Sequence, residues 1–252
     1  MSFPWRLRLV HEGHSSIRVE RAGRWFRFDP HTAPEPDQQV VLTWAELERA
    51  TGTVAAVKNG DNPRVVAIPV LRTWLHSFGS VQDQSPGGKV DDVQVDAIEY
   101  QPIAYATATE AARKTRAALL KPGTAAMRLL RRARGPQSAP IVVQLTFPDG
   151  GRLLHLNCAL HANTPSDWLD RAVERFGGAD WVVAGVDYEE QEAFEARVGR
   201  FGAKKLLVTD LVNDTRAGLG LPVRHLTPLV DRLRDKDEDA YPFVSGATYR
   251  FE

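Results

Sequence analysis

The sequence predicts an α/β (α+β) protein in which two packed β-sheets carry helices on their outer faces. Two observations support this fold class. Each half of the chain begins with alternating, hairpin-like strand sequence, and each half continues with strand–helix–strand units. The halves are only loosely similar, so we expect one domain over residues 1–252 rather than a repeat array.

Composition narrows the class of protein. The chain has 252 residues, of which 43% are hydrophobic and 25% charged, and its 32 basic and 32 acidic residues cancel. Zero net charge gives no bulk attraction to nucleic acid or anionic membranes. There is no long apolar run and no signal segment, and the single Cys158 excludes an intramolecular disulfide. We therefore expect a soluble cytoplasmic protein with no membrane contact.

The first half contains most of the predicted antiparallel strands. Apolar–polar alternation predicts strands over 5–9, 17–20 and 25–28, a turn at 21–24, and a strand end at Asp29-Pro30. Further elements follow in order: a strand at 40–43, a helix at 45–59 closed by Gly60, a strand at 65–68, a helix around 71–75, a polar loop at 80–92 and a strand at 90–98.

Residues 104–134 differ in composition from their surroundings. They are rich in Ala, Leu and Arg and are interrupted only by Lys121-Pro122-Gly123. Proline and glycine end one helix and admit another, so we expect a helical hairpin inserted into the domain.

The second half begins again with strands. A hairpin is predicted over 141–147 and 152–156, around the turn at 148–151. The predicted elements that follow are a helix at 166–176 with Ser166 as its N-cap, strands at 181–186 and 204–209, helices at 189–201 and 226–234, and a last strand at 247–251.

The N-terminal order carries a family resemblance. Gly13-His14-Ser15 lies between two strands and is followed by a third strand ending at Asp29-Pro30. This order resembles the start of the metallo-β-lactamase superfamily, especially its ascorbate-phosphate-lactonase-like branch. The resemblance covers most of the chain outside 104–134 and implies the four-layer αββα sandwich of that superfamily.

The stretch of this chain that corresponds to the superfamily's metal-binding motif differs from that motif. The family has Thr-His-x-His-x-Asp-His after a short strand, and this chain has Thr43-Trp44-Ala45-Glu46-Leu47-Glu48-Arg49. Trp44, Glu46 and Arg49 replace histidines, and Glu48 replaces the aspartate. Tryptophan offers no lone pair to a metal, and a protonated guanidinium repels cations. We therefore predict that the standard zinc site is lost and that no cofactor is bound.

Two later positions extend this pattern. By the resemblance, Cys158 stands for the bridging aspartate and Asp210 for the last ligand. The alternative is a metal-dependent hydrolase of a small ester, lactone or phosphoester with a rebuilt site, whose candidate residues are Asp29, Glu46, Glu48, His155, Cys158 and Asp210.

Several candidates also have an ordinary structural interpretation. The spacing His155-x-x-Cys158-x-x-His161 suits a metal, but on a strand the cysteine points away from the histidines, so we favour a buried thiol over a ligand or nucleophile. Glu46 and Glu48 complement a helix N-terminus, or they form a catalytic carboxylate pair. By the resemblance, Asp29 orients a metal-binding histidine, and here we expect it to pair with Arg49 instead. We expect His14 to hydrogen-bond its loop.

The insertion is strongly basic. Its charged residues are a single acid, Glu110, and the bases Arg113, Lys114, Arg116, Lys121, Arg128, Arg131, Arg132 and Arg134. It could recognise an anion, a nucleic acid or a protein. Interleaved aromatic residues for base stacking are missing, so nucleic acid is disfavoured against a solvated or protein-contacting face. The turns at 187–190 and 212–216 are further pocket candidates, because such strand ends surround the active-site cleft in the family.

The favoured function is therefore a binding or partner-docking protein without hydrolase activity, whose partner is a protein or a small anionic ligand. The metal-dependent hydrolase is the first alternative. An anion- or nucleic-acid-binding module acting through the insertion is the second.

Overall fold

The computed structural model describes residues 7–13, 16–43, 50–100, 140–186, 190–210, 213, 217 and 222–252. The chain divides into two compact units. The described residues of the first unit are those up to Ala97 together with Val244–Glu252, and those of the second unit lie between Ile98 and Phe243. Each unit is described separately below.

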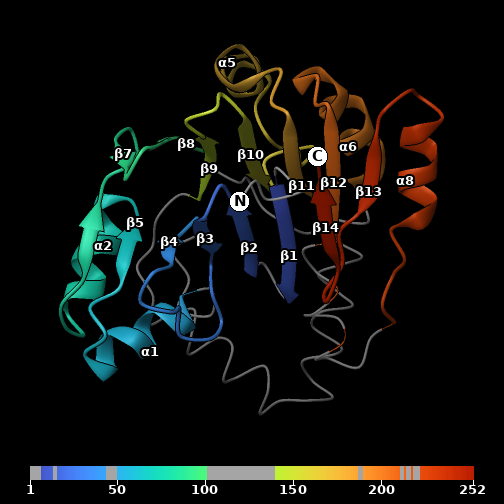
Figure 1. The fold of residues 1–252 in the computed structure, drawn as a ribbon. Helices are drawn as coiled ribbons and strands as arrows, with labels where there is room; N and C mark the ends of the chain where they lie inside the picture. The colour runs from blue at the N-terminus through green and yellow to red at the C-terminus, as the bar shows by residue number, and fades with distance from the viewer. Residues whose placement is uncertain are drawn as a thin grey trace. The chain divides into compact units, whose positions relative to one another are not determined.

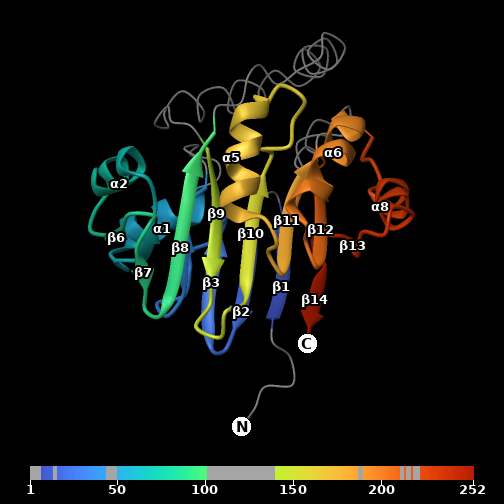
Figure 2. The same ribbon diagram turned by 90° about the horizontal axis from the view of Figure 1, so that it is seen from above.

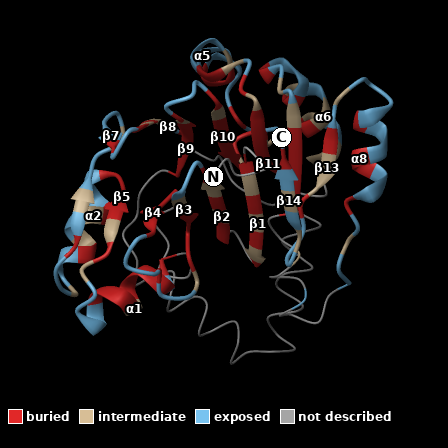
Figure 3. Ribbon diagram, viewed as in Figure 1, coloured by how far each residue is buried: buried red, intermediate tan, exposed pale blue. Residues whose placement is uncertain are grey.

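The first sheet contains seven described strands. They are β1 (Leu7–Gly13), β2 (Ser16–Arg21), β3 (Arg24–Phe28), β4 (Gln39–Val41), β5 (Arg64–Val66), β6 (Gln82–Gln84) and β14 (Thr248–Phe251). Their order is β14-β1-β2-β3-β4-β5-β6. The strands from β14 to β3 pair antiparallel, and those from β3 to β6 pair parallel. Leu9, Val19 and Phe26 are opposite one another and buried, as the alternation predicts. Figure 3 shows buried and partly buried residues along β1 and β2.

Two described helices accompany this sheet, α1 (Thr51–Asn59) and α2 (Pro69–His76). Figure 1 shows both beside β4 and β5. Gly60 ends α1 in the left-handed conformation, with φ 84°, which glycine adopts without steric cost. The described helix begins at Thr51 rather than at the predicted residue 45, and residues 44–49 lie outside the described part of the chain.

The second sheet also contains seven described strands. They are β7 (Lys89–Val90), β8 (Val93–Glu99), β9 (Ile141–Thr146), β10 (Arg152–Asn157), β11 (Trp181–Val186), β12 (Lys205–Asp210) and β13 (Ala240–Pro242). Their order is β13-β12-β11-β10-β9-β8-β7, and β10 to β13 run parallel. All six residues of β11 are buried, as expected for a central parallel strand.

The described helices of the second unit are α5 (Ser166–Phe176), α6 (Gln191–Val198) with the following 3₁₀ turn (Gly199–Phe201), and α8 (Thr227–Arg234). Trp168, Phe194 and Leu229 of these helices share one apolar cluster with Leu154 and Val182 of the sheet. Figure 2 shows α5 lying along the sheet beside β10.

The predicted order of strands and helices is confirmed wherever the structure describes it, with local differences. The short strands β6 and β7 lie within the predicted polar loop at 80–92, and β13 was not predicted because its three residues include a proline. Proline is tolerated there because β13 is at the edge of its sheet. Ser166 is the first residue of α5, and its predecessor Pro165 occupies the N-cap position. The predicted basic hairpin at 104–134 lies outside the described residues, and none of the described helices is long and apolar enough to span a membrane.

Candidate functional site

In the first unit, Asp29 and Thr43 are joined by two hydrogen bonds. Asp29 follows β3, is fully buried and has a positive φ of 44°. The backbone N–H of Thr43 donates to Asp29 Oδ1 at 2.8 Å, and the Thr43 hydroxyl donates to Oδ2 at 2.5 Å. The expected pairing of Asp29 with Arg49 concerns a residue outside the described part of the chain.

The segment after Asp29 is equally constrained. Arg27 donates to the Glu12 carboxylate at 2.6 Å, to the Thr32 hydroxyl at 2.9 Å and to the carbonyl of Ala33 at 3.2 Å. Gly52, in the first turn of α1, donates its N–H to Pro30 O at 2.9 Å. A Cβ at Gly52 would lie 2.6 Å from Pro30 O and still nearer to Thr32 O, so only glycine fits this approach.

In the second unit, the parallel strands end beside a turn that carries Cys158. Ligands of open α/β sheets commonly bind beyond the carboxyl ends of such strands. Asn157 ends β10 with φ 53°, a left-handed conformation that asparagine tolerates, and it redirects the chain into the turn. Cys158 Sγ lies 2.9 Å from the hydroxyl oxygen of Tyr100, and the Cys158 N–H donates to that oxygen at 3.4 Å. Cys158, which we expected to be a buried thiol, is half-buried, and it is bound to the Tyr100 hydroxyl.

His161 continues the same turn. Its Nε2 lies 3.7 Å from Glu190 Oε1, and its Nδ1 accepts the N–H of Asn163 at 3.2 Å. Cys158, His161 and Glu190 line one small hollow together with Leu160, Gly185, Val186 and Phe194. A thiol, an imidazole and a carboxylate thus converge at the ends of β10 and β11.

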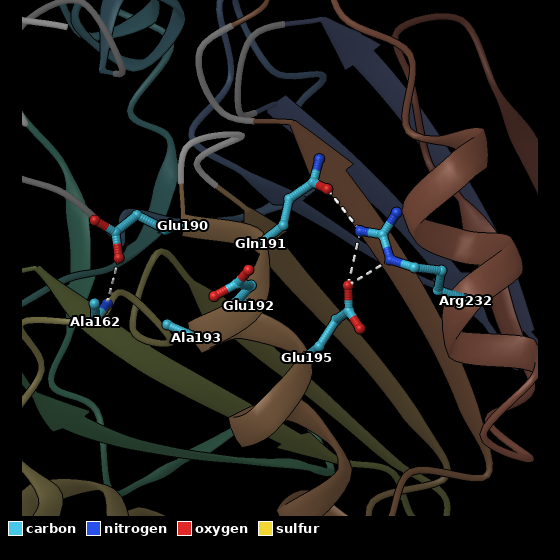
Figure 4. Close-up of a pocket in the computed structure, with 7 residues that line it drawn as sticks. All are labelled: Ala162, Glu190, Gln191, Glu192, Ala193, Glu195 and Arg232. Carbon is cyan, nitrogen blue, oxygen red and sulfur yellow. Dashed lines mark hydrogen bonds and ion pairs between the residues drawn. The ribbon is translucent and has the colours of Figure 1, made fainter. Parts of the chain in front are cut away.

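A larger cavity of about 570 Å³ adjoins this hollow through Glu190. Its lining comes from the turn, from the beginning of α6 and from α8, as Figure 4 shows, and comprises Ala162, Glu190, Gln191, Glu192, Ala193, Glu195 and Arg232. Glu190 Oε2 accepts the N–H of Ala162 at 3.1 Å.

Glu195 is the most strongly held acid of this cavity. Arg232 donates to its Oε1 at 2.8 Å and Lys236 to its Oε2 at 2.8 Å, while Arg232 also donates to Gln191 Oε1 at 2.6 Å. Burial acts to raise the pKa of Glu195, but the hydrogen bonds from Lys236 and Arg232 outweigh burial, and the pKa lies below its ordinary value of 4.5. Glu195 therefore remains ionised and orients Arg232.

Asp210, at the end of β12, binds the backbone of Asn213. Its Oδ1 accepts the N–H of Asn213 at 2.8 Å, and the Asn213 side chain binds the backbone of Arg224 through both its amide nitrogen and its carbonyl oxygen. The strands β10 and β12, which end at Asn157 and Asp210, lie on opposite sides of β11, two strand spacings or about 9.5 Å apart. Asp210 and Asn157 are thus held on separate strands.

The structure brings only some of the predicted site residues together. His155 is buried on β10, whereas His161 and Cys158 share the turn beyond it. Within the described residues, no three His, Cys, Asp or Glu side chains are grouped so as to hold a metal ion. The candidates outside the described part are His14, Trp44, Glu46, Glu48, Arg49 and the basic residues of 104–134.

The sequence reasoning missed Thr43, Tyr100 and Arg197 as partners of the candidate residues. Thr43 belongs to the family motif and could have been found there. Tyr100 and Arg197 lie 58 and 36 residues from their partners in the turn, and no sequence spacing signals such contacts.

Comparisons with known proteins show the fold. No protein-family profile matches the chain, and no curated protein matches it in sequence. A metallo hydrolase from the archaeon Ignicoccus hospitalis is similar in structure, with a TM-score of 0.63, 13% identity and coverage of 98% of each chain. An isothiocyanate hydrolase from Delia radicum gut bacteria has a TM-score of 0.58 and 12% identity, covering 97% of this chain and 99% of its own.

A possible metal-dependent hydrolase from Veillonella parvula has a TM-score of 0.57 at 11% identity, covering 97% of this chain and 99% of its own. At these identities the likeness shows the fold alone. The predicted fold class, the α/β metallo-β-lactamase type, is confirmed.

Proposed function

Because the chain has the metallo-β-lactamase fold, we propose that it is a binding protein that has given up the zinc-activated hydrolysis of that superfamily. The single observation that carries this proposal is the double hydrogen bond from Thr43 to Asp29. In zinc enzymes of the superfamily, the equivalent carboxylate orients a metal-binding histidine. Here that carboxylate, Asp29, binds the backbone and the hydroxyl of Thr43. Thr43 directly precedes residues 44–49, which contain no histidine.

The donor set of the motif supports the same proposal. A zinc site takes three or four nitrogen, sulfur or oxygen donors at about 2.0–2.3 Å. Trp44 supplies no donor and Arg49 brings a permanent positive charge. Asp210 binds the backbone N–H of Asn213, and Cys158 binds Tyr100. The residues at these positions do not fit a zinc ion of the usual kind.

The cavity beside α6 is the proposed binding site. It is lined by Ala162 of the turn, by Glu190 and the beginning of α6, and by Arg232 of α8, and it is large enough for a small polar molecule. Thermal shift against phosphate, L-ascorbate, L-arginine and spermidine tests this site. We expect at least one probe to raise the melting temperature of the wild-type protein.

A matched pair of variants assigns that shift to the cavity. Ala193 lines the cavity, so A193F fills it and abolishes the shift, whereas A196F substitutes an exposed alanine on the same helix that is not in the lining and retains it. The absence of any shift, or a shift that survives A193F, contradicts binding at this cavity.

A metal-dependent hydrolase remains the second candidate, because the similar structures named above are metallo or metal-dependent hydrolases. Its test is bound metal that a chelator removes together with hydrolysis of lactone or ester substrates.

A further inference from the structure

We propose that Arg197 is the positioning residue of the candidate site: it holds the turn at 161–164 and thereby keeps the proton of the neutral His161 ring on Nε2. The inference rests on the proposed function only in assuming that the site binds a ligand. Its evidence and its test concern only the turn and two of its side chains.

Arg197 lies near the end of α6 and binds three carbonyl groups of one short turn. Its Nη1 donates to the carbonyls of His161 and Thr164, the latter at 3.2 Å, and its Nη2 donates to the carbonyl of Ala162 at 2.8 Å. A guanidinium presents its donors in a planar fork, so three fixed carbonyls suit arginine and not lysine.

The same turn is held from the other end of α6. Glu190 directly precedes the helix, and its Oε2 accepts the N–H of Ala162 at 3.1 Å. A donor and an acceptor, seven residues apart in sequence, therefore bind the backbone of the turn. Because these contacts are made to backbone atoms, they set the path of the chain and not the choice of side chain.

The path of the turn determines the chemistry of His161. The N–H of Asn163 donates to His161 Nδ1 at 3.2 Å. A backbone amide can only donate, so Nδ1 must present its lone pair and the neutral ring must carry its proton on Nε2. That nitrogen lies 3.7 Å from Glu190 Oε1, in the hollow that Cys158 also lines. Arg197 thus fixes which histidine nitrogen offers a proton toward Glu190 in this hollow.

Variants of Arg197 test this role through the ring ¹⁵N shifts of His161, assigned among the seven histidines with H161N. R197A is the main variant and R197K retains the charge with fewer contacts. R200A is the matched control, because Arg200 follows α6 and pairs with Asp170. The second readout is the reaction rate of Cys158, the single cysteine of the chain, with DTNB.

We expect the neutral His161 ring of wild type and R200A to carry its proton on Nε2 and not on Nδ1. R197A should show mixed tautomers and a DTNB rate about tenfold higher, because local opening of the turn becomes more frequent. R197K should lie between them. Wild-type shifts and rates in R197A overturn the proposal, and if R197A does not fold, wild-type values in R197K overturn it. Neither readout needs a ligand. A negative result for Arg197 can therefore be distinguished from a negative result in the ligand-binding assay that tests the proposed function.

Discussion

Asp29 and Thr43 join the ends of two neighbouring strands through both oxygens of one buried carboxylate. The N–H of Thr43 reaches Oδ1 at 2.8 Å and its hydroxyl reaches Oδ2 at 2.5 Å. Asp29 follows β3 and Thr43 follows β4, which pairs with β3 in parallel. This pair ties the residue that follows β3 to the last described residue before position 44.

Substituting Thr43→Val should therefore destabilise the protein. The variant removes the hydroxyl donor to a buried carboxylate, at a cost of about 1–3 kcal/mol. Urea denaturation at pH 7 measures the change. Thr248→Val, at an exposed position of the edge strand β14, serves as the control and should change stability by less than about 0.5 kcal/mol. Equal stability of the two variants would contradict the role of the Asp29–Thr43 pair.

Gly52→Ala should be more damaging than its small volume suggests. The new methyl group would lie 2.6 Å from Pro30 O and nearer to Thr32 O, so the backbone at Pro30 and Thr32 would have to move to make room for it. We expect a loss of about 3 kcal/mol, the upper range for overpacking. At Gly88 the nearest atom, Ser85 O, lies 3.8 Å away, so G88A is the control. A G52A protein as stable as G88A would show that the 29–33 segment is free to move.

The strands differ in how well they could be predicted from the sequence. Alternation predicted β1 and β2, in which buried residues alternate with less buried ones. Strands β9 and β10 are buried on both faces, and their apolar runs around the turn at 148–151 predicted the hairpin instead. Strands β6, β7 and β13 were not predicted, because two or three residues are too few to show an alternation of apolar and polar side chains. These strands form by pairing with neighbouring strands of the sheets.

The candidate site was predicted less completely. Motif positions placed Asp29, Cys158 and Asp210 at the ends of β3, β10 and β12. Their partners Tyr100 and Asn213, and the arginine Arg197 that holds the turn, depend on tertiary contacts of the folded chain. Sequence spacing could not indicate them.

The cavity acid Glu195 should make stability depend on pH. Its pKa is lowered in the folded protein, so it contributes stability that is present above its ordinary value of 4.5. This contribution is lost as the pH falls through the folded pKa. E195Q should cost about 1–2 kcal/mol at pH 7 and almost nothing near pH 2, as charge-assisted hydrogen bonds imply. E192Q, at an exposed position of the same helix, should be neutral at both values. A cost for E195Q that does not change with pH would contradict this linkage.

The basic residues of 104–134 give a prediction from sequence alone. If this segment is solvated or contacts protein, neutralising Arg131, Arg132 and Arg134 to glutamine should leave retention on a heparin column nearly unchanged. A phosphate-binding surface would instead lose affinity and salt dependence with each arginine removed. Clearly earlier elution of the triple variant would favour the anion- or nucleic-acid-binding alternative.

The zinc content of the purified wild-type protein tests the central claim most directly. The protein is dialysed against zinc chloride and then against metal-free buffer, and bound metal is measured by mass spectrometry alongside hydrolysis of lactone and ester substrates. The account predicts substoichiometric zinc and no hydrolysis that a chelator removes. One or more zinc ions per chain, lost to a chelator together with activity, would contradict it.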